Sequence, residues 1–435
     1  MSDLSHGNPI NVGLLGLGVV GGGVAATLLE HSESIAAKVG RPVNLKKVLV
    51  RDAARKRDVS VPDSLITTNP EDILSDPDIP LVVEVIGGES PAAQYLKDAL
   101  QSGKHVVTAN KEVMAKRGPE LLSVASRNGV SLLYEASVGG GIPIIGCLVK
   151  ELVANRFHSV RSIINGTTNY ILTRMANDHT DFSLALAEAQ ERGYAEADPT
   201  NDIEGFDAVY KLSILAGLAF HRRVPPESIY REGITRLQPQ DFRYAHELGY
   251  AIKSLAIATE EGGAIQARVY PALVPQDNML AKVDGVYNAV EVEGSLCGRV
   301  LIHGRGAGRG PTTSAVVGDL VEIARNISSG STPLPSVAPE DSGQTRSIDD
   351  LECQYFLRLN IADRPGVLAQ IARILGDQNI SIASVLQKDA NPEAQTAEIV
   401  ITTHPARELW VQRALQQAED LEVVQEINSL LRIED

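Results

Sequence analysis

Cysteine, clustered histidine and aromatic side chains are scarce in this sequence. Its 435 residues include three cysteines, Cys147, Cys297 and Cys353, and no two of them have the C-x-x-C spacing. An odd number without that spacing argues against a disulfide framework and favours reduced thiols in the cytoplasm. The nine histidines form no H-x-x-x-H or H-x-H pair, which argues against a zinc site.

Positive charge and long apolar runs are also in short supply. Lys and Arg number 40 against 55 Asp and Glu, a formal net charge of −15, so neither nucleic acid nor an anionic membrane surface is an expected partner. The opening residues, MSDLSHGNPI, lack the apolar stretch of a signal peptide, and no run approaches the length of a membrane span. We therefore expect a cytoplasmic protein without a membrane partner.

Short apolar runs that alternate with helical patterns are plentiful. They are rich in Val, Ile, Ala and Gly, which predicts an α/β protein. The length of the chain suggests about three domains.

The first of these runs leads into a glycine-rich turn. Residues 10–15 (INVGLL) predict a buried strand, GLGVVG follows directly, and a helical pattern comes next. Glycines in that context permit a tight turn and the close approach of a pyrophosphate, which sits on the helix N-terminus. A dinucleotide site is therefore predicted, the alternative being a glycine-rich turn of another α/β fold. The predicted contacts are Gly16, Leu17, Gly18, Val19, Val20 and Gly21.

The end of the second predicted strand, 45–50, bears on the choice of cofactor. An acidic residue there binds the ribose hydroxyls of NAD, whereas an arginine accepts the 2′-phosphate of NADP. Arg51 and Asp52 are both present, so the choice stays open. The many basic residues nearby favour NADP, with NAD tolerated; simple solvation of the strand end by these side chains is the alternative.

The parallel winding continues along the chain. Ligands of open parallel sheets bind beyond the carboxyl ends of the strands. Ser90, Lys111 and the turn 135–141 fall there, so Lys111 is a candidate to meet a substrate or nicotinamide, or else a solvated lysine at a strand end. The further strands are expected at 81–88, 105–111 and 130–141.

An acidic stretch, 193–211 (GYAEADPTNDIEGFDAVYK), stands in the middle of the chain. Asp207 and Lys211 are four apart and share one face of a helix. With Glu196 on the preceding loop, they can hold a small zwitterion and move a proton. The alternative is an ordinary surface ion pair and a helix cap, which are common and weak.

Between the turn and this stretch, the patterns predict a long helix at 142–156, then a strand, a turn at 165–169 (NGTTN) and a helix. At this point the chain resembles homoserine dehydrogenase. The matching motifs are GLGVVG, VIGG, TANK, EASVGGGIP, NGTTN, GYAEADPTNDIEGFDAVYK and GRGAGRGPT, in that order over residues 10–320.

The resemblance implies an activity and a set of roles. The activity is reversible, NAD(P)H-dependent reduction of L-aspartate 4-semialdehyde to L-homoserine, in the biosynthesis of threonine, methionine and isoleucine. Glu196 and Asp207 would hold the substrate amino group, and Lys211 would be the general acid. Lys111 would assist at the reacting carbonyl, and Thr167 would contact the substrate.

The resemblance also implies contacts outside the reacting groups, and a homodimer or homotetramer. Ser90, Gly193, Gly306 and Gly308 would approach the cofactor. One departure from the family pattern is residues 208–210, Ala-Val-Tyr, where small or basic residues are usual. A structural sodium ion would be bound, largely by backbone oxygens, at Glu135, Val138, Gly140 and Ile142.

The last quarter has a separate pattern. Residues 329–353 are rich in Ser, Pro, Gly and Asp, which predicts a linker. The run 354–435 predicts a ferredoxin-like βαββαβ order. Asp363 and Gly366, in DRPG, resemble the ligand turn of the ACT domain, which implies feedback by threonine; a domain used only for oligomerisation is the alternative.

The predicted architecture is therefore α/β with three parts. Two other functions remain open: another ACT-bearing NAD(P) dehydrogenase, acting on phosphoglycerate or prephenate, and a non-catalytic amino-acid sensor. The first would be expected to use a catalytic histidine, and none lies in a recognisable motif. The predicted parts are a Rossmann-type NAD(P)-binding domain (10–141, with 305–328 returning to it), an α+β substrate and dimerisation domain (142–304), and the linker and ACT domain.

Overall fold

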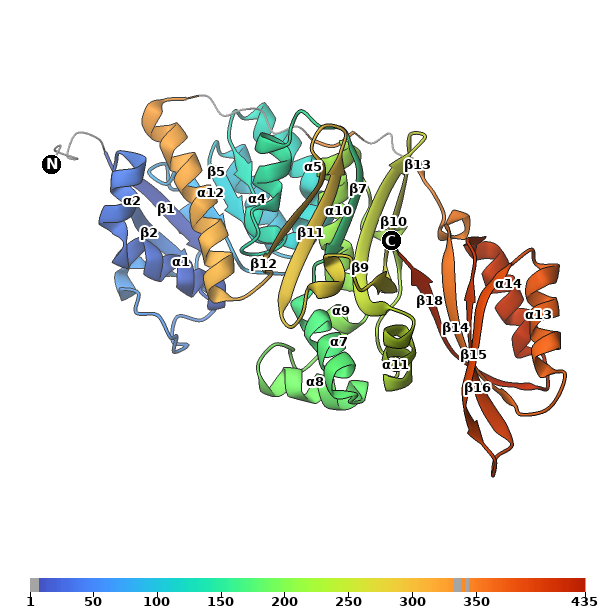
Figure 1. Cartoon of the computed structure of the whole chain (residues 1–435). Coiled ribbons are helices and arrows are strands. Elements are labelled where there is room, and N and C mark those ends of the chain that lie inside the picture. Colours follow the sequence, from blue (N-terminus) through green and yellow to red (C-terminus); the bar gives the residue numbers. More distant parts are fainter. Residues whose placement is uncertain (1–7, 332–337, 341–343, 435) are drawn as a thin grey trace. The chain divides into compact units, whose positions relative to one another are not determined.

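The computed structural model describes residues 8–331, 338–340 and 344–434 (Figure 1). The first seven residues, and 332–337 and 341–343 of the predicted linker, lie outside this description. The chain divides into two compact units, which are treated separately below. The first comprises Met1–Val160, Tyr210–Pro226 and Ala289–Gly343, and the second comprises Arg161–Val209, Glu227–Asn288 and Gln344–Asp435.

Among its described residues, the first unit contains a parallel sheet in the order β3-β2-β1-β4-β5-β6. Its central strands are apolar runs buried on both faces, as expected for a sheet covered on both sides. The predicted Rossmann-type fold is confirmed. The strands are β1 (Ile10–Leu15), β2 (Val43–Leu49), β3 (Ile66–Thr67), β4 (Leu81–Glu84), β5 (His105–Thr108) and β6 (Leu132–Leu133).

Helices pack on this sheet, and the last of them comes from far along the chain. Val316 and Leu320 of α12 (Arg309–Ser329) are fully buried in one core with Val12 and Val24. Figure 1 shows α12 beside α1 (Val19–Glu30). The other helices of this sheet are α2 (Ser32–Val39), α3 (Glu71–Leu74), α4 (Ala92–Gln101) and α5 (Lys111–Arg127).

Four expected elements differ from the structure. The strands expected at 81–88 and 105–111 end at Glu84 and Thr108, and Lys111 begins α5. The strand expected at 130–141 is limited to β6, because the chain turns into a 3-10 helix at Glu135–Ser137. Gly139 and Gly140 then have φ values of 73° and 53°, outside the strand region. The long helix expected at 142–156 is a short helix, α6 (Ile144–Gly146), followed by a π turn at Cys147–Glu151. Its first turn is fixed from outside the helix, since the Glu135 carboxylate accepts hydrogen bonds from two of its backbone N–H groups.

The second unit carries a long antiparallel hairpin. β9 (Tyr250–Glu261) pairs with β10 (Ala264–Pro275) along its whole length, and β8 (Tyr230–Arg231) pairs parallel with β10. Helices of the unit include α7 (Gly166–Asp178), α8 (Phe182–Glu191), α9 (Thr200–Ile203) and α11 (Pro239–Glu247). The other elements in this part of the chain are β7 (Phe157–Ile163), α10 (Phe206–Phe220), β11 (Tyr287–Gly294) and β12 (Gly298–Arg305).

The C-terminal part of this unit has the predicted βαββαβ order, with one added short strand. Alternate residues of β14, such as Tyr355 and Leu357, face α13 and α14, which cover one side of the sheet (Figure 1). Phe356 points the other way and shares a core with Tyr244 of α11. The elements are β14 (Glu352–Ala362), α13 (Val367–Asp377), β15 (Ile382–Asn391), β16 (Thr396–Thr403), β17 (Ala406–Arg407), α14 (Glu408–Glu419) and β18 (Val424–Ile433).

The last strand joins this domain to the hairpin. β18 pairs antiparallel with β14 and, at its end, parallel with β10. Glu434 then accepts hydrogen bonds from Arg268 at 2.8 Å and from Tyr270 at 2.5 Å, and all three side chains are buried. The ACT sheet is thus continuous with the sheet of the hairpin.

No helix in the described ranges is both long and apolar enough to cross a membrane. All three cysteines are free thiols.

Candidate active site

The glycine-rich turn has the geometry of a phosphate site. Gly16 has a φ of 105°, and a Cβ on Gly21 would lie 2.2 Å from the Gly16 carbonyl oxygen. Gly18 faces open space and precedes α1 without any side-chain cap. The N–H groups at the start of this twelve-residue helix are therefore available to an anion. Leu17 is buried and Val19 is exposed.

The loop after β2 presents cationic side chains. The Asp52 carboxylate accepts a hydrogen bond from Ala54 N at 2.9 Å, so it stabilises the turn in which Asp52 itself lies. Arg57 donates to the Asp52 carbonyl oxygen at 2.6 Å, which closes the turn further. Arg51 is exposed at the end of the strand.

A buried polar network ties the carboxyl ends of β4 and β5 together. The Thr108 hydroxyl donates to Glu84 at 2.6 Å, and the Asn110 amide donates to the Gly88 carbonyl at 2.7 Å. Asn110 also caps α5, accepting from Val113 N, and Lys111 is the first residue of that helix. The position of Lys111 is thus fixed by the cap. In the sequence, Glu84 could be recognised only as an acidic residue at the end of an apolar run.

Glu84 gives the first unit a pH dependence of stability. Burial raises the pKa of Glu84 above its ordinary 4.5, although hydrogen bonds from Thr108 and Ile86 N oppose the shift. The folded state therefore keeps a proton that the unfolded state has lost, and stability falls as pH rises from about 4.5 through the raised pKa. When the free energy of unfolding is measured with urea at several pH values in this range, it is expected to change less with pH in Glu84→Gln than in wild type. Equal slopes for the two proteins would contradict the assignment.

The turn for which a sodium site was predicted contains the half-buried Glu135 carboxylate and backbone oxygens, and Asp319 of α12 contacts it. Glu135 accepts from Ile145 N at 2.9 Å and Gly146 N at 2.6 Å, and Asp319 accepts from Glu135 N at 2.9 Å. Burial and the nearby Glu135 charge raise the pKa of Asp319 to about 7. Within the described ranges there is no group of three or more His, Cys, Asp or Glu that could hold a metal. Any alkali cation here would therefore depend on carbonyl oxygens.

In the second unit, Asn165 brings two acidic side chains together. Its amide nitrogen donates to Asp207 at 2.8 Å and to Asp202 at 2.7 Å. Its amide oxygen accepts from Thr168 N at 2.8 Å and caps α7. NGTTN is therefore a helix start rather than a free turn. Sequence reasoning missed Asn165 and Asp202, although an Asn before a helical pattern is a typical cap.

The same helix start holds the loop that carries the other predicted substrate residues. The Thr167 hydroxyl donates to the Tyr194 carbonyl at 2.5 Å, and Thr168 donates to the Asp202 carbonyl at 3.1 Å. Gly193, with a φ of 72°, begins this loop after α8. Glu196 is exposed on it, with its side chain open to a ligand.

Asp207 and Lys211 lie on one face of α10, as predicted. Both side chains are buried, at 3% and 8% exposure. This argues against the alternative of a surface pair, because neither charged group is exposed to solvent. Tyr210, the departure from the family pattern, places its ring 5.6 Å from the Lys116 ammonium.

Family models match the chain in three consecutive segments. They are described as the homoserine dehydrogenase NAD-binding domain at residues 16–135, homoserine dehydrogenase at 143–321 and the ACT domain at 355–423. The chain is also 42% identical over 425 residues to the homoserine dehydrogenase of Bacillus subtilis, covering 98% of each protein. The chain belongs to the homoserine dehydrogenase family.

Other members of the family support this membership. The Pseudomonas aeruginosa homoserine dehydrogenase is 41% identical over 96% of each chain. The crystal structure of a homoserine dehydrogenase from Thiobacillus denitrificans matches 98% of this chain and 99% of its own, with a TM-score of 0.90 and 42% identity. A hyperthermophilic archaeal homoserine dehydrogenase in complex with NADPH matches 76% of this chain, with a TM-score of 0.62 and 26% identity.

Membership in the homoserine dehydrogenase family settles the class of protein. The chain is an oxidoreductase with a nicotinamide-cofactor domain and an ACT domain. A dehydrogenase acting on phosphoglycerate or prephenate is no longer a competing interpretation.

Proposed function

We propose that the protein catalyses the reversible NAD(P)H-dependent reduction of L-aspartate 4-semialdehyde to L-homoserine, in the cytoplasm, on the route to threonine, methionine and isoleucine. The observation that carries this proposal is the buried pair Asp207 and Lys211 on one face of α10, in a chain of this family. Asn165 holds the Asp207 carboxylate in place, so a pre-organised anion is available for the substrate ammonium.

The proposed mechanism assigns a role to each predicted side chain. The nicotinamide cofactor supplies a hydride to the aldehyde carbon when it is bound. Asp207 and Glu196 bind the substrate ammonium and so orient the aldehyde. Lys211 stabilises the negative charge that develops on the carbonyl oxygen and then donates a proton to it. Lys111 assists at the same oxygen, and Thr167 lines the substrate site through its hydroxyl oxygen.

NADPH is the proposed preferred reductant, with NADH accepted. The exposed guanidinium of Arg51 suits a 2′-phosphate, and the Asp52 carboxylate is already used by its own turn. That an archaeal relative was solved with NADPH is consistent with this preference. Ser90, Gly193, Gly306 and Gly308 complete the proposed cofactor contacts. A structural sodium ion is proposed at Glu135 and the carbonyl oxygens of Val138, Gly140 and Ile142.

The direct test is an assay on the full chain. Oxidation of NADPH is followed by absorbance with L-aspartate 4-semialdehyde, and again with succinate semialdehyde, which lacks the amino group. We expect turnover of the first aldehyde and a much lower kcat/KM for the second, because Asp207 and Glu196 would have no ammonium to bind. Absence of turnover with L-aspartate 4-semialdehyde would refute the proposed function. The same assay with NADH measures the cofactor preference.

We propose further that the ACT domain binds threonine and inhibits the enzyme, in a homodimer or homotetramer where ACT domains of two copies meet. Asp363 and Gly366 lie in an exposed turn, and Gly366, with a φ of 89°, precedes α13 without a side-chain cap. An eleven-residue helix with uncapped N–H groups suits the carboxylate of an amino acid, and Asp363 suits its ammonium.

Threonine titration of the full chain tests this assignment. Asp363→Ala is expected to raise the threonine concentration for half-inhibition about tenfold, because one charge-assisted hydrogen bond is lost. Each protein is compared with its own uninhibited rate, and Asp377→Ala, on the exposed surface of α13, is the matched control. The same threonine sensitivity in wild type and Asp363→Ala would contradict the assignment.

A further inference from the structure

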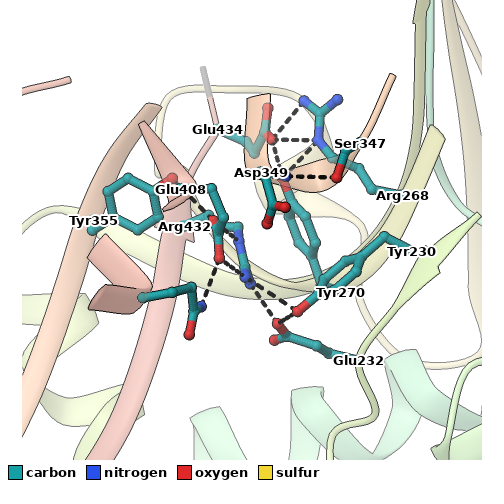
Figure 2. Close-up of polar contacts among 11 residues, drawn as sticks. Tyr230, Glu232, Arg268, Tyr270, Ser347, Asp349, Tyr355, Glu408, Arg432 and Glu434 are labelled. Atoms are coloured by element: carbon teal, nitrogen blue, oxygen red, sulfur yellow. Dashed lines mark hydrogen bonds and ion pairs between the residues drawn. The ribbon is translucent and has the colours of Figure 1, made fainter. Parts of the chain in front are cut away.

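The C-terminal strand carries a buried arginine that connects the ACT domain to the segment 230–234. Arg432 of β18 has no exposed surface. Two of its nitrogens pair with the Glu408 carboxylate at 2.6 and 2.8 Å, and a third lies 2.8 Å from Glu232 (Figure 2). The Tyr230 hydroxyl, which donates to Glu232, lies 3.4 Å from the same guanidinium. One cation thus connects the ACT helix α14 with β8.

The segment 230–234 is in turn bound to the start of α10. Arg231 donates to the Glu204 carbonyl, and its guanidinium lies 3.7 Å above the ring of Phe206. Ile234 N donates to the Ile203 carbonyl at 2.9 Å. The two backbones also fit closely, since a Cβ on Gly233 would lie 2.8 Å from that carbonyl oxygen. These contacts fix residues 203–206 against the segment.

Residues 203–206 lead directly to Asp207. Gly205 has a φ of 82°, and an added Cβ would lie 3.4 Å from Arg231 Cγ. Since Phe206 is the first residue of α10, the place of its ring and of the preceding carbonyl sets where the helix begins. The orientation of the Asp207 carboxylate therefore depends on Arg231 as well as on Asn165.

Polar pairs, rather than apolar packing, hold the segment to α14. A cleft of about 940 Å³ lies between them, lined by Arg236 and Leu237 on one side and by Gln416 and Glu419 on the other. The ion pair bridges this cleft, beside an apolar core that Ile234 and Leu237 share with Leu431 of β18. A change in the ACT domain that moves Arg432 would thus be passed to segment 230–234.

We infer that Arg231 is a positioning residue for Asp207, and that the Arg432–Glu232 pair is a polar connection through which the ACT domain acts on substrate affinity. The inference rests on the proposed role of Asp207 in binding the substrate. Two other ion pairs of the ACT domain lie away from residues 203–207, because Arg358 pairs with Asp241 and Lys388 with Glu247, both on α11. An apolar contact does reach them, since Ile203 packs against a core that includes Phe356 and Leu431 of the ACT sheet.

Three variants of the full chain, with one control, test the inference by kinetics. Arg231→Met is expected to raise the KM for L-aspartate 4-semialdehyde about tenfold or more, because the start of α10 loses its restraint, while kcat and the KM for NADPH change by less than about threefold. The KM of Arg231→Lys is expected to lie between those of wild type and Arg231→Met, because an ammonium can still donate a hydrogen bond to the Glu204 carbonyl. Glu232→Gln is expected to raise the same KM about threefold, because it weakens the pair with Arg432 and leaves Arg231 in place. Lys388→Met is the matched control and should leave all three constants unchanged.

Hydrogen–deuterium exchange supplies a readout that needs no turnover. Arg231→Met and Glu232→Gln should speed exchange at residues 203–212, whereas Lys388→Met should not. Unchanged exchange and unchanged KM in folded Arg231→Met would overturn the inference; if that variant does not fold, Glu232→Gln alone decides. A wild type that shows no turnover refutes the proposed function instead, and exchange still reports on the connection.

Discussion

Replacing Lys211 with alanine is expected to lower kcat for the reduction of L-aspartate 4-semialdehyde about a thousandfold, the usual contribution of a positioned general acid. The side chain is the buried cation of the proposed site, and Asp207 precedes it by one helical turn. Without it, the developing alkoxide loses its proton donor and keeps only the assistance proposed for Lys111. The dissociation constant for NADPH, measured by fluorescence titration, should be unchanged, because the predicted phosphate contacts are at the turn 16–21.

Lys211→Arg distinguishes the two parts of this role. An arginine retains the positive charge but does not release its proton at neutral pH. We expect Lys211→Arg to recover part of kcat if charge stabilisation dominates, and little if proton transfer dominates. Lys97→Ala, which removes a half-exposed lysine paired with Glu120, is the control and should be fully active. A kcat for Lys211→Ala within a few-fold of wild type would refute the assignment of the general acid.

The largest expected effect on stability comes from Arg432. Arg432→Met leaves Glu408 buried without its cation, and breaking such a pair typically costs about 3–5 kcal/mol. Urea unfolding of the full chain should show a loss of this size. Lys388→Met, which removes a half-exposed pair, should cost roughly 0–1 kcal/mol.

A double substitution and a pH series test the cause of that loss. Burial raises the pKa of Glu408, but the hydrogen bonds and charge of Arg432 outweigh it, so the net pKa is lowered. Wild type therefore loses this contribution as pH falls below about 4.5, the ordinary value. In Arg432→Met the carboxyl is buried without its cation, so acid should stabilise that variant relative to wild type. Adding Glu408→Gln should recover part of the loss, and no recovery would point to lost packing instead.

The sequence was sufficient for those features that depend on neighbours along the chain. A strand, GLGVVG and a helix predict the cofactor turn, because all the groups that shape it lie within one short segment. The spacing of Asp207 and Lys211 likewise predicts a shared face. The helix expected at 142–156 was wrong in its bounds, because α6 turns into a π turn at Cys147–Glu151. Hydrophobic periodicity also does not reveal that Glu135 holds the first turn of α6.

The residues that place the predicted side chains could not be found in this way. Asn165 reaches Asp207 across 42 residues, and Arg231 reaches Glu204 across 27. Such contacts arise only when separate elements pack. The position of Asn165 before a helical pattern indicates a helix cap but not its bond to Asp207, and Arg231 does not stand out by type or spacing. The order of elements in the ACT domain was predictable from alternation, but the pairing of β18 with β10 was not, since it joins strands more than 150 residues apart.

The continuity between β10 and β18 has a practical consequence for enzyme engineering. Regulatory domains are often removed or exchanged as cassettes, on the assumption that the catalytic part is complete without them. Here, a chain cut after residue 328 would lose Glu434. Arg268, which is 4% exposed, would then be a buried cation without the carboxylate that it pairs with. Such a product would be a destabilised enzyme, not a deregulated one. Variants without feedback inhibition are better made by point substitutions in the ACT turn. Chimaeras that retain β18 and Glu434 are the other suitable design.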